Sequence, residues 1–182
     1  CTVLGPGTID GDWMGVSLLE DRVTLTISDV TIRNGKVGIL GFARQHDRAR
    51  VNATNVTIED VGDWAISATV IRPDGLTVTG AAATLYAVIA DRIIGTNIDV
   101  SGNGAIGIKA RKLKASNVTV IGNGGTGVDV ARALLIDSTL TGNAAGGSGV
   151  DLRSTGRPRL ANTTCGLSSD GNGGTWGVCT ND

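Results

Sequence analysis

The sequence has few of the residues that fill or interrupt most globular domains: 3 Pro, 1 His, 1 Met, 1 Phe and 1 Tyr among 182 residues. The single His, and three Cys without a Cys-x-x-Cys pair, argue against a zinc site. The formal net charge is −1, so the chain as a whole has no attraction to nucleic acid or to an anionic membrane. No apolar run approaches the length of a membrane span, and we therefore expect neither nucleic acid nor a membrane span among its interactions.

Glycine is abundant, with 28 residues, and Val, Ile, Thr and Asn accompany it. This composition favours short strands separated by tight turns. The pattern Gly-x-Gly-x-x-Gly starts at Gly102 and again at Gly122. A dinucleotide-binding loop requires a helix after this pattern, whereas both copies are followed by alternating β-branched residues without a helix cap. The pattern therefore indicates an internal repeat and not a nucleotide site.

The repeat consists of a small residue followed by an aliphatic one, and its copies lie 20 to 28 residues apart. A period of this length, with three strand-like pieces in each unit, is typical of a parallel β-solenoid. Equivalent residues should then stack in columns about 4.8 Å apart. The predicted inward aliphatic column is Val16, Ile39, Ile66, Val88, Ile108, Val128, Val150 and Val178.

Two rows of asparagine follow the same rhythm. The first row is Asn55, Asn97, Asn117 and Asn162, which we expect to lie at an inner corner with their amides bonded to one another. Burial there would argue against glycosylation at the sequons of Asn55, Asn117 and Asn162. The second row is Asn34, Asn103, Asn123 and Asn143, which we expect to supply positive-φ turn positions.

The spacing and the pattern "SNVTVIGN…GV" resemble the right-handed parallel β-helix proteins of the pectate lyase-like superfamily, from Gly15 to Val178. The resemblance implies an all-β, single-stranded right-handed parallel β-helix of about eight turns with three short strands per turn, forming one domain over residues 1–182. It also implies a secreted or cell-surface bacterial protein that binds polysaccharide along its first sheet. The superfamily includes lyases, hydrolases, epimerases and non-catalytic modules, so the resemblance does not choose among them. Members usually begin with a capping helix, which residues 1–16 do not predict. We therefore expect either an upstream cap or end-to-end self-association.

Charged residues recur two positions after the small residue. The predicted outward column is Ser17, Leu40, Ser67, Ile89, Lys109, Asp129, Asp151 and Cys179, with Arg111 and Arg153 two residues further along. Carboxylates one layer apart repel unless a cation intervenes, so Asp129 and Asp151 would share a calcium ion or basic side chains. In a lyase, Lys109 or Arg111 would remove the proton; a glycoside hydrolase is the second enzyme class. The alternative is a salt-bridge ladder without catalytic function.

Basic residues are concentrated on the same predicted strand and the turn after it, which hold 12 of the 16. Such a stripe suits an acidic polysaccharide, and the candidate contacts are Arg44 and His46 in the insertion Gly41–Arg50, together with Arg132 and Arg157. The alternative is that these are solvated turn charges on a non-catalytic adhesion or spacer module of a larger extracellular protein.

Two of the three cysteines, Cys165 and Cys179, are close in sequence near the C-terminus. They form either a disulfide that staples the last segment in an oxidising compartment or a pair of reduced, buried thiols. Trp176 lies where a plug for that end of the solenoid is expected.

Overall fold

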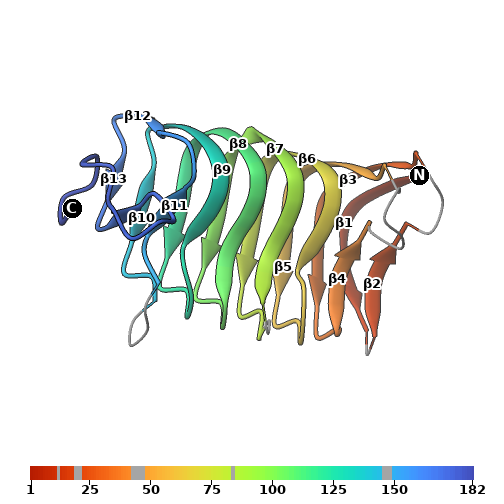
Figure 1. Cartoon of the computed structure of the whole chain (residues 1–182). Helices are drawn as coiled ribbons and strands as arrows, with labels where there is room; N and C mark the ends of the chain where they lie inside the picture. Colours follow the sequence, from red (N-terminus) through yellow and green to blue (C-terminus); the bar gives the residue numbers. More distant parts are fainter. Residues whose placement is uncertain (12, 19–21, 42–47, 83–84, 145–148) are drawn as a thin grey trace.

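The computed structural model describes residues 1–11, 13–18, 22–41, 48–82, 85–144 and 149–182. These residues form a 14-stranded parallel sheet and no helix. Successive turns of the chain stack as a β-solenoid of about seven turns (Figure 1). The prediction of an all-β parallel solenoid is confirmed, with about seven turns in place of about eight. The strands are β1 (Thr2–Asp10), β2 (Met14–Ser17), β3 (Thr24–Arg33), β4 (Val37–Leu40), β5 (Arg50–Glu59), β6 (Ile66–Thr79), β7 (Tyr86–Ser101), β8 (Ile106–Ile121), β9 (Val128–Ile136), β10 (Thr139–Thr141), β11 (Leu152–Ser154), β12 (Arg159–Ala161), β13 (Thr164–Cys165) and β14 (Ser168–Ser169).

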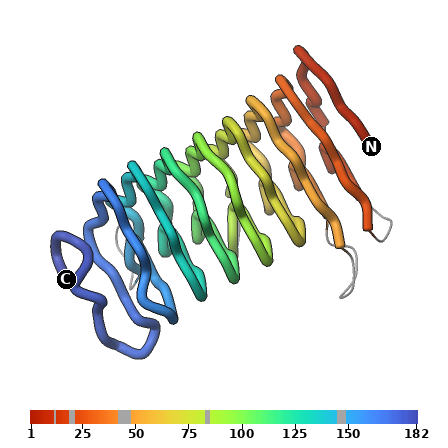
Figure 2. Tube along the Cα trace, turned by 90° about the horizontal axis from the view of Figure 1, so that it is seen from above, coloured from red at the N-terminus to blue at the C-terminus, as the bar shows by residue number. Residues whose placement is uncertain are grey.

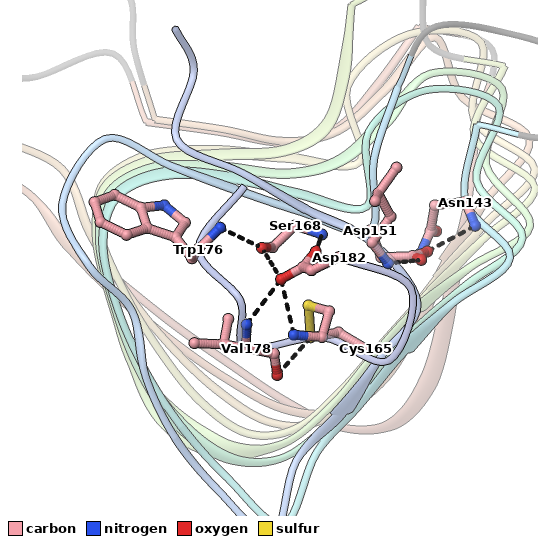
Figure 3. The surroundings of a disulfide bond; sticks show 9 residues. Asn143, Asp151, Cys165, Ser168, Trp176, Val178 and Asp182 are labelled. Atoms are coloured by element: carbon pink, nitrogen blue, oxygen red, sulfur yellow. Dashed lines mark hydrogen bonds between the residues drawn. A yellow bond between two sulfur atoms is a disulfide. The ribbon is translucent and has the colours of Figure 1, made fainter. Parts of the chain in front are cut away.

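Each complete turn bends at three places, which gives the stack the roughly triangular outline seen along its axis (Figure 3). In β8 the buried side chains alternate with outward ones, except where Arg111 and Lys112 both point outward and where Asn117 takes a positive φ of 53°. The first bend separates a first segment, 106–110, from a second, 112–116, and the second bend begins a third, 118–121. We call the outer surfaces of these segments, and of their equivalents in other turns, the first, second and third faces.

The core is the stacked interior of these segments, and its columns follow from strand register. Val16, Ile39, Ile66, Val88, Ile108 and Val128 pair in succession, as the sequence predicts. All but Val16 are at most 1% exposed. The small residue before each aliphatic also has a physical reason, because a Cβ on Gly38 would lie 2.3 Å from the carbonyl oxygen of Ala65.

The column prediction is wrong for the last two turns. Val128 pairs with Leu152, and Leu152 pairs with Ser168, so Val150 and Val178 are not in the column. The step from Val128 to Leu152 is 24 residues, against 20 from Ile108 to Val128. The motif "GVDL" looks like the preceding "GVDV", but its fourth residue, Leu152, occupies the inward column in place of its second residue, Val150. Leu152 takes the inward place expected for Val150, and because Asp151 before it is also buried, the strict alternation assumed by the prediction does not hold at this position.

The two asparagine rows have exchanged the roles that the sequence suggests, except at Asn34 of the second row, which has the expected positive φ, at 59°. Asn55, Asn97, Asn117 and Asn162 are exposed and have φ between 48° and 55°, so they form the left-handed second bend. Their side chains do bond along the axis, as from Asn117 Nδ2 to Asn97 Oδ1 at 2.7 Å. Asn103 and Asn123 are instead 2% and 1% exposed, and the preceding Gly102 and Gly122 hold the positive φ of their turn.

The C-terminal end of the stack is covered by the last 18 residues, 165–182, which curl across it (Figures 2 and 3). A disulfide joins Cys165 to Cys179 with their Cα atoms 4.8 Å apart. The Asp182 carboxylate accepts hydrogen bonds from the amides of Ser168, Val178 and Cys179. Trp176 Nε1 donates to the Ser154 carbonyl at 2.8 Å. At the opposite end β1 is the last strand of the sheet, and Leu4 there is 70% exposed.

Candidate functional site

The first face carries the charged column that the sequence suggests, with one different member. Lys109 pairs in register with Asp129, and Asp129 pairs with Arg153. Lys109 Nζ lies 2.7 Å from Asp129 Oδ2, and Arg153 Nη1 lies 3.5 Å from the same oxygen. The residue above Asp129 is therefore an arginine and not Asp151, and the single carboxylate is neutralised by a cation on either side.

Asp151 lies inside the solenoid and is 6% exposed. Its Oδ1 accepts hydrogen bonds from the amide and the Nδ2 of Asn143, at 3.0 and 2.8 Å, and its Oδ2 accepts one from the Leu167 amide at 3.1 Å. Figure 3 shows this contact between Asp151 and Asn143 at the end of the stack. The expectation that Asp129 and Asp151 form one carboxylate pair is wrong, because the two side chains are on opposite sides of the sheet. The calcium site expected from that pair loses its geometric basis.

The described residues contain no group of three or more His, Cys, Asp or Glu side chains that could hold a metal ion. Arg111 is at the first bend, where its Nε and Nη2 donate to the two carboxylate oxygens of Asp91. The hydrogen bond and charge of Asp91 raise the pKa of Arg111, and the bond from Arg111 lowers the pKa of Asp91. Lys109, Arg111, Asp91 and Asp129 line a shallow depression of about 380 Å³. Its charges are thus already paired within the protein, and Arg111 is held in its protonated form.

The second face has a different electrostatic character. Its outward column runs through Thr24, Arg50, Val70, Arg92, Lys112 and Arg132, each pairing in register with the next. Like charges directly opposite on neighbouring strands repel each other. None of Arg50, Arg92, Lys112 and Arg132 lies within 4.0 Å of a carboxylate oxygen among the residues that the structure describes. Its consecutive cations Arg92, Lys112 and Arg132 thus have no direct ion pair in the described part of the chain, although the charges of Arg92 and Lys112 help to lower the pKa of the nearby Asp91.

A groove of about 480 Å³ on this face is lined by Lys112, Lys114, Arg132, Arg157 and Arg159, together with Leu113, Ala133, Leu134 and Gly156. Five of its nine lining residues are cationic and none is acidic. Arg159 pairs in register with Leu134, and Arg157, which lies between β11 and β12, lines the same groove as Arg132. This groove is the strongest candidate for a binding site in the described part of the chain.

The structure therefore divides the predicted basic stripe between two faces. Arg132 and Arg157 come together in the groove, whereas Lys109, Arg111 and Arg153 lie on or beside the first face and are bonded to acids. Arg44 and His46 lie outside the described residues. Sequence reasoning missed Lys112, Lys114 and Arg159 as site residues. The alternation of Lys114 with Leu113 and Ala115 in "RKLKAS" indicates its outward position.

Comparison of the chain with protein family models, curated proteins and solved structures found no match. None of the described residues belongs to a helix that is long and apolar enough to cross a membrane.

Proposed function

We propose that this protein binds an acidic polysaccharide through the cationic groove of its second face, without cleaving it. In this proposal it is a secreted or cell-surface bacterial module of the pectate lyase-like superfamily. The observation that carries the proposal is the groove itself, in which five cations converge without a carboxylate. Clustered charge of one sign in an open groove attracts an extended polymer of the opposite sign.

Two further observations support binding at this place. The stacked cations repel one another across neighbouring strands, and a bound polyanion would relieve that repulsion. The groove also has apolar floor residues, Leu113 at 2% exposure and Ala133 at 6%. Four of its five cations belong to the strands β8, β9 and β12, and Arg157 lies just before β12. Little ordering of the protein is then required when a ligand binds, which favours affinity.

The first face gives less support to catalysis. A base in an elimination must give up its proton, yet Asp91 raises the pKa of Arg111 and Lys109 is bonded to Asp129. The disulfide Cys165–Cys179 suits the oxidising compartment of an extracellular protein.

Isothermal titration calorimetry with polygalacturonate at several salt concentrations tests the proposal. We expect salt-sensitive binding that weakens about tenfold in an Arg132→Gln/Arg157→Gln variant, at roughly threefold for each exposed charge contact. The control is Lys36→Gln/Lys109→Gln, which removes the same charge away from the groove and should bind as the unmodified protein does.

The ultraviolet absorbance of the same mixtures separates binding from cleavage, because elimination creates unsaturated sugar products. We expect no increase in absorbance, and its appearance would contradict the binding-only proposal. Absence of binding to every acidic polysaccharide would leave the rigid stack as a spacer or adhesion module. Equal weakening in the two double variants would show that only net charge matters.

A further inference from the structure

The second face carries another hollow, which lies beside the cationic groove and differs from it in chemistry. This hollow has a volume of about 260 Å³ and crosses β7, β8 and β9. Strand register arranges its outward side chains in two walls, one of Ile94, Lys114 and Leu134 and the other of Thr96, Ser116 and Ile136. The small residues Gly95 and Ala115 line the floor between the walls. We call this hollow the apolar trough.

The trough gathers apolar side chains at the surface. Ile94 and Ile136 are 37% and 39% exposed, and Leu134 is partly exposed. Single exposed hydrophobic residues are common, but several in one hollow with polar groups at its rim are typical of a ligand-binding groove. Lys114 fits such a wall, because its methylene stem is apolar while its ammonium group reaches water. The trough therefore favours a ligand with an apolar portion.

The two walls set the width and the direction of the trough. Outward residues i and i+2 of one strand are about 6.7 Å apart, and neighbouring strands are about 4.8 Å apart. The trough is thus narrow across the strands' length and runs from the layer of Ile94 to the layer of Leu134. This shape has room for a single unbranched hydrocarbon chain.

The two ends of the trough differ in charge. At the β9 end, Arg159 of β12 pairs in register with Leu134 and continues the wall. Arg159 is exposed, lines the cationic groove and forms no ion pair within the described part of the chain. At the other end, Asp74 pairs in register with Thr96 and accepts a hydrogen bond from its Oγ1 at 3.0 Å. A negative head group is therefore attracted to the Arg159 end and repelled from the Asp74 end.

We infer that the trough binds a free single-chain anionic amphiphile of the fatty-acid type, with its carboxylate at Arg159 and its hydrocarbon chain extended toward Ile94. The charges of the two ends determine the place of the head group. This direction also lets one chain cover Ile136, Leu134 and Ile94, whereas a carboxylate at Lys114, in the middle layer, would leave one end uncovered. The inference goes beyond the proposed function and does not rest on it, because an acidic polysaccharide has no hydrocarbon chain to place in the trough.

The length of the trough predicts the length of the ligand. Three strand spacings separate the layer of Arg159 from that of Ile94, which is about 14 Å. An extended carbon chain advances about 1.3 Å per bond, so about eleven carbons fill the trough. A methylene in an open trough is about half covered, so each one should raise the affinity about twofold until that length is reached.

Titration with linear carboxylates from hexanoate to tetradecanoate, below their micelle concentrations and followed by methyl NMR, measures these affinities. The methyl signals of Ile94 and Ile136 should shift. Those of Ile121, which is 38% exposed on the third face, should not. Decyltrimethylammonium, which has a chain of similar length and a positive head, should bind at least tenfold more weakly than decanoate.

Two variants separate the head group from the chain. Arg159→Gln should weaken binding of every carboxylate about threefold, whatever its length, because one exposed charge contact is lost. Ile94→Gln should leave hexanoate binding unchanged and move the plateau from about eleven carbons to about seven, because the apolar wall loses its last layer. The matched control is Ile121→Gln, which has nearly the same exposure as Ile94 and should change neither quantity.

The outcomes keep this inference apart from the proposed function. A plateau that Ile94→Gln does not move, or methyl shifts of Ile121 as large as those of Ile94, would overturn the trough as the binding site. Failure of every free carboxylate to bind, even if the protein binds vesicles of anionic phospholipid, would overturn the free amphiphile as the ligand. Polygalacturonate should bind Ile94→Gln as it binds the unmodified protein, and failure of polygalacturonate to bind either one would overturn the proposed function alone.

Discussion

The buried asparagine ladder yields the sharpest stability prediction. Asn123 is 1% exposed, and its Nδ2 donates to the Val100 carbonyl at 2.8 Å and to Asn143 Oδ1 at 2.9 Å. Its Oδ1 accepts from the amide and from the Nδ2 of Asn103, at 3.1 and 2.9 Å. The change Asn123→Ala removes all four hydrogen bonds from a site that water does not reach.

Each buried hydrogen bond contributes about 1 kcal/mol to stability, so four give about 4 kcal/mol. The Val100 carbonyl and the Asn103 amide belong to the stacked backbone, so they cannot move to find other partners when the Asn123 side chain is removed. The free energy of these hydrogen bonds is therefore lost in full. We therefore expect Asn123→Ala to lower the free energy of unfolding by about 4 kcal/mol and the melting temperature by roughly 10 °C. Urea titration followed by circular dichroism measures the first quantity, and a thermal scan measures the second.

The control is Asn117→Gly on the same strand layer. Asn117 is exposed, donates one side-chain hydrogen bond to Asn97, and has a φ of 53° that glycine adopts without strain. This variant should change the free energy of unfolding by less than about 1 kcal/mol. Equal effects of Asn123→Ala and Asn117→Gly would refute the reasoning that the inner ladder, and not the outer one, stabilises the stack.

Three further predictions concern the C-terminal turns. Asp151→Ala should lower the free energy of unfolding, measured by urea titration, by about 3 kcal/mol, because three buried hydrogen bonds are lost. Asp129→Ala should lower it by only about 1 kcal/mol, because the basic partners of Asp129 reach solvent. The variant Cys165→Ala/Cys179→Ala loses the stabilisation of about 3 kcal/mol that the disulfide provides by closing a loop. Hydrogen exchange of the Thr180 and Asn181 amides should then be roughly 100-fold faster. Burial opposes ionisation of Asp182, but hydrogen bonds from Ser168 and from the amides of Cys179 and Val178 outweigh it and lower the pKa of this carboxyl. Its contribution is therefore present above the ordinary Asp pKa of about 3.9 and is lost as the pH falls through the lower folded value. Trp176 fluorescence should report this loosening, and Asp182→Asn should abolish the acid transition.

Much of this fold is readable from the sequence because a solenoid turns sequence period into spatial neighbourhood. From Val16 to Val128 the aliphatic copies identify the register correctly, since only aliphatic side chains fill the interior. At the last turns the same motif misleads, because Leu152 and Val150 are equally apolar and differ by two positions. What decides between them is the Asp151 carboxylate, which takes the hydrogen bonds at the end of the ladder.

The candidate site was less predictable than the fold. Residue type and spacing correctly place Lys109 beside Asp129, but they do not show the bend after Ala110, where two outward residues follow each other. That bend turns Lys112 and Arg132 onto another face from Lys109. The asparagine rows show the same limit, because a positive φ can be held either by Asn117 or by the glycine before Asn123, and composition allows both.

The regular spacing of the central turns has a consequence for how such a rod changes length. Ile108 and Val128 occupy equivalent positions 20 residues apart, so excision of residues 109–128 would join Ile108 to Asp129 with every inner column still continuous. The shortened molecule would be about 5 Å shorter and would lose Lys112 from its row of cations. Duplication of the same segment would add one layer and one further lysine to that row. The length of the solenoid and the number of cations in the row are thus coupled. Genetic gain or loss of whole turns would change both the length of the protein and the size of the ligand it can bind, by equal increments.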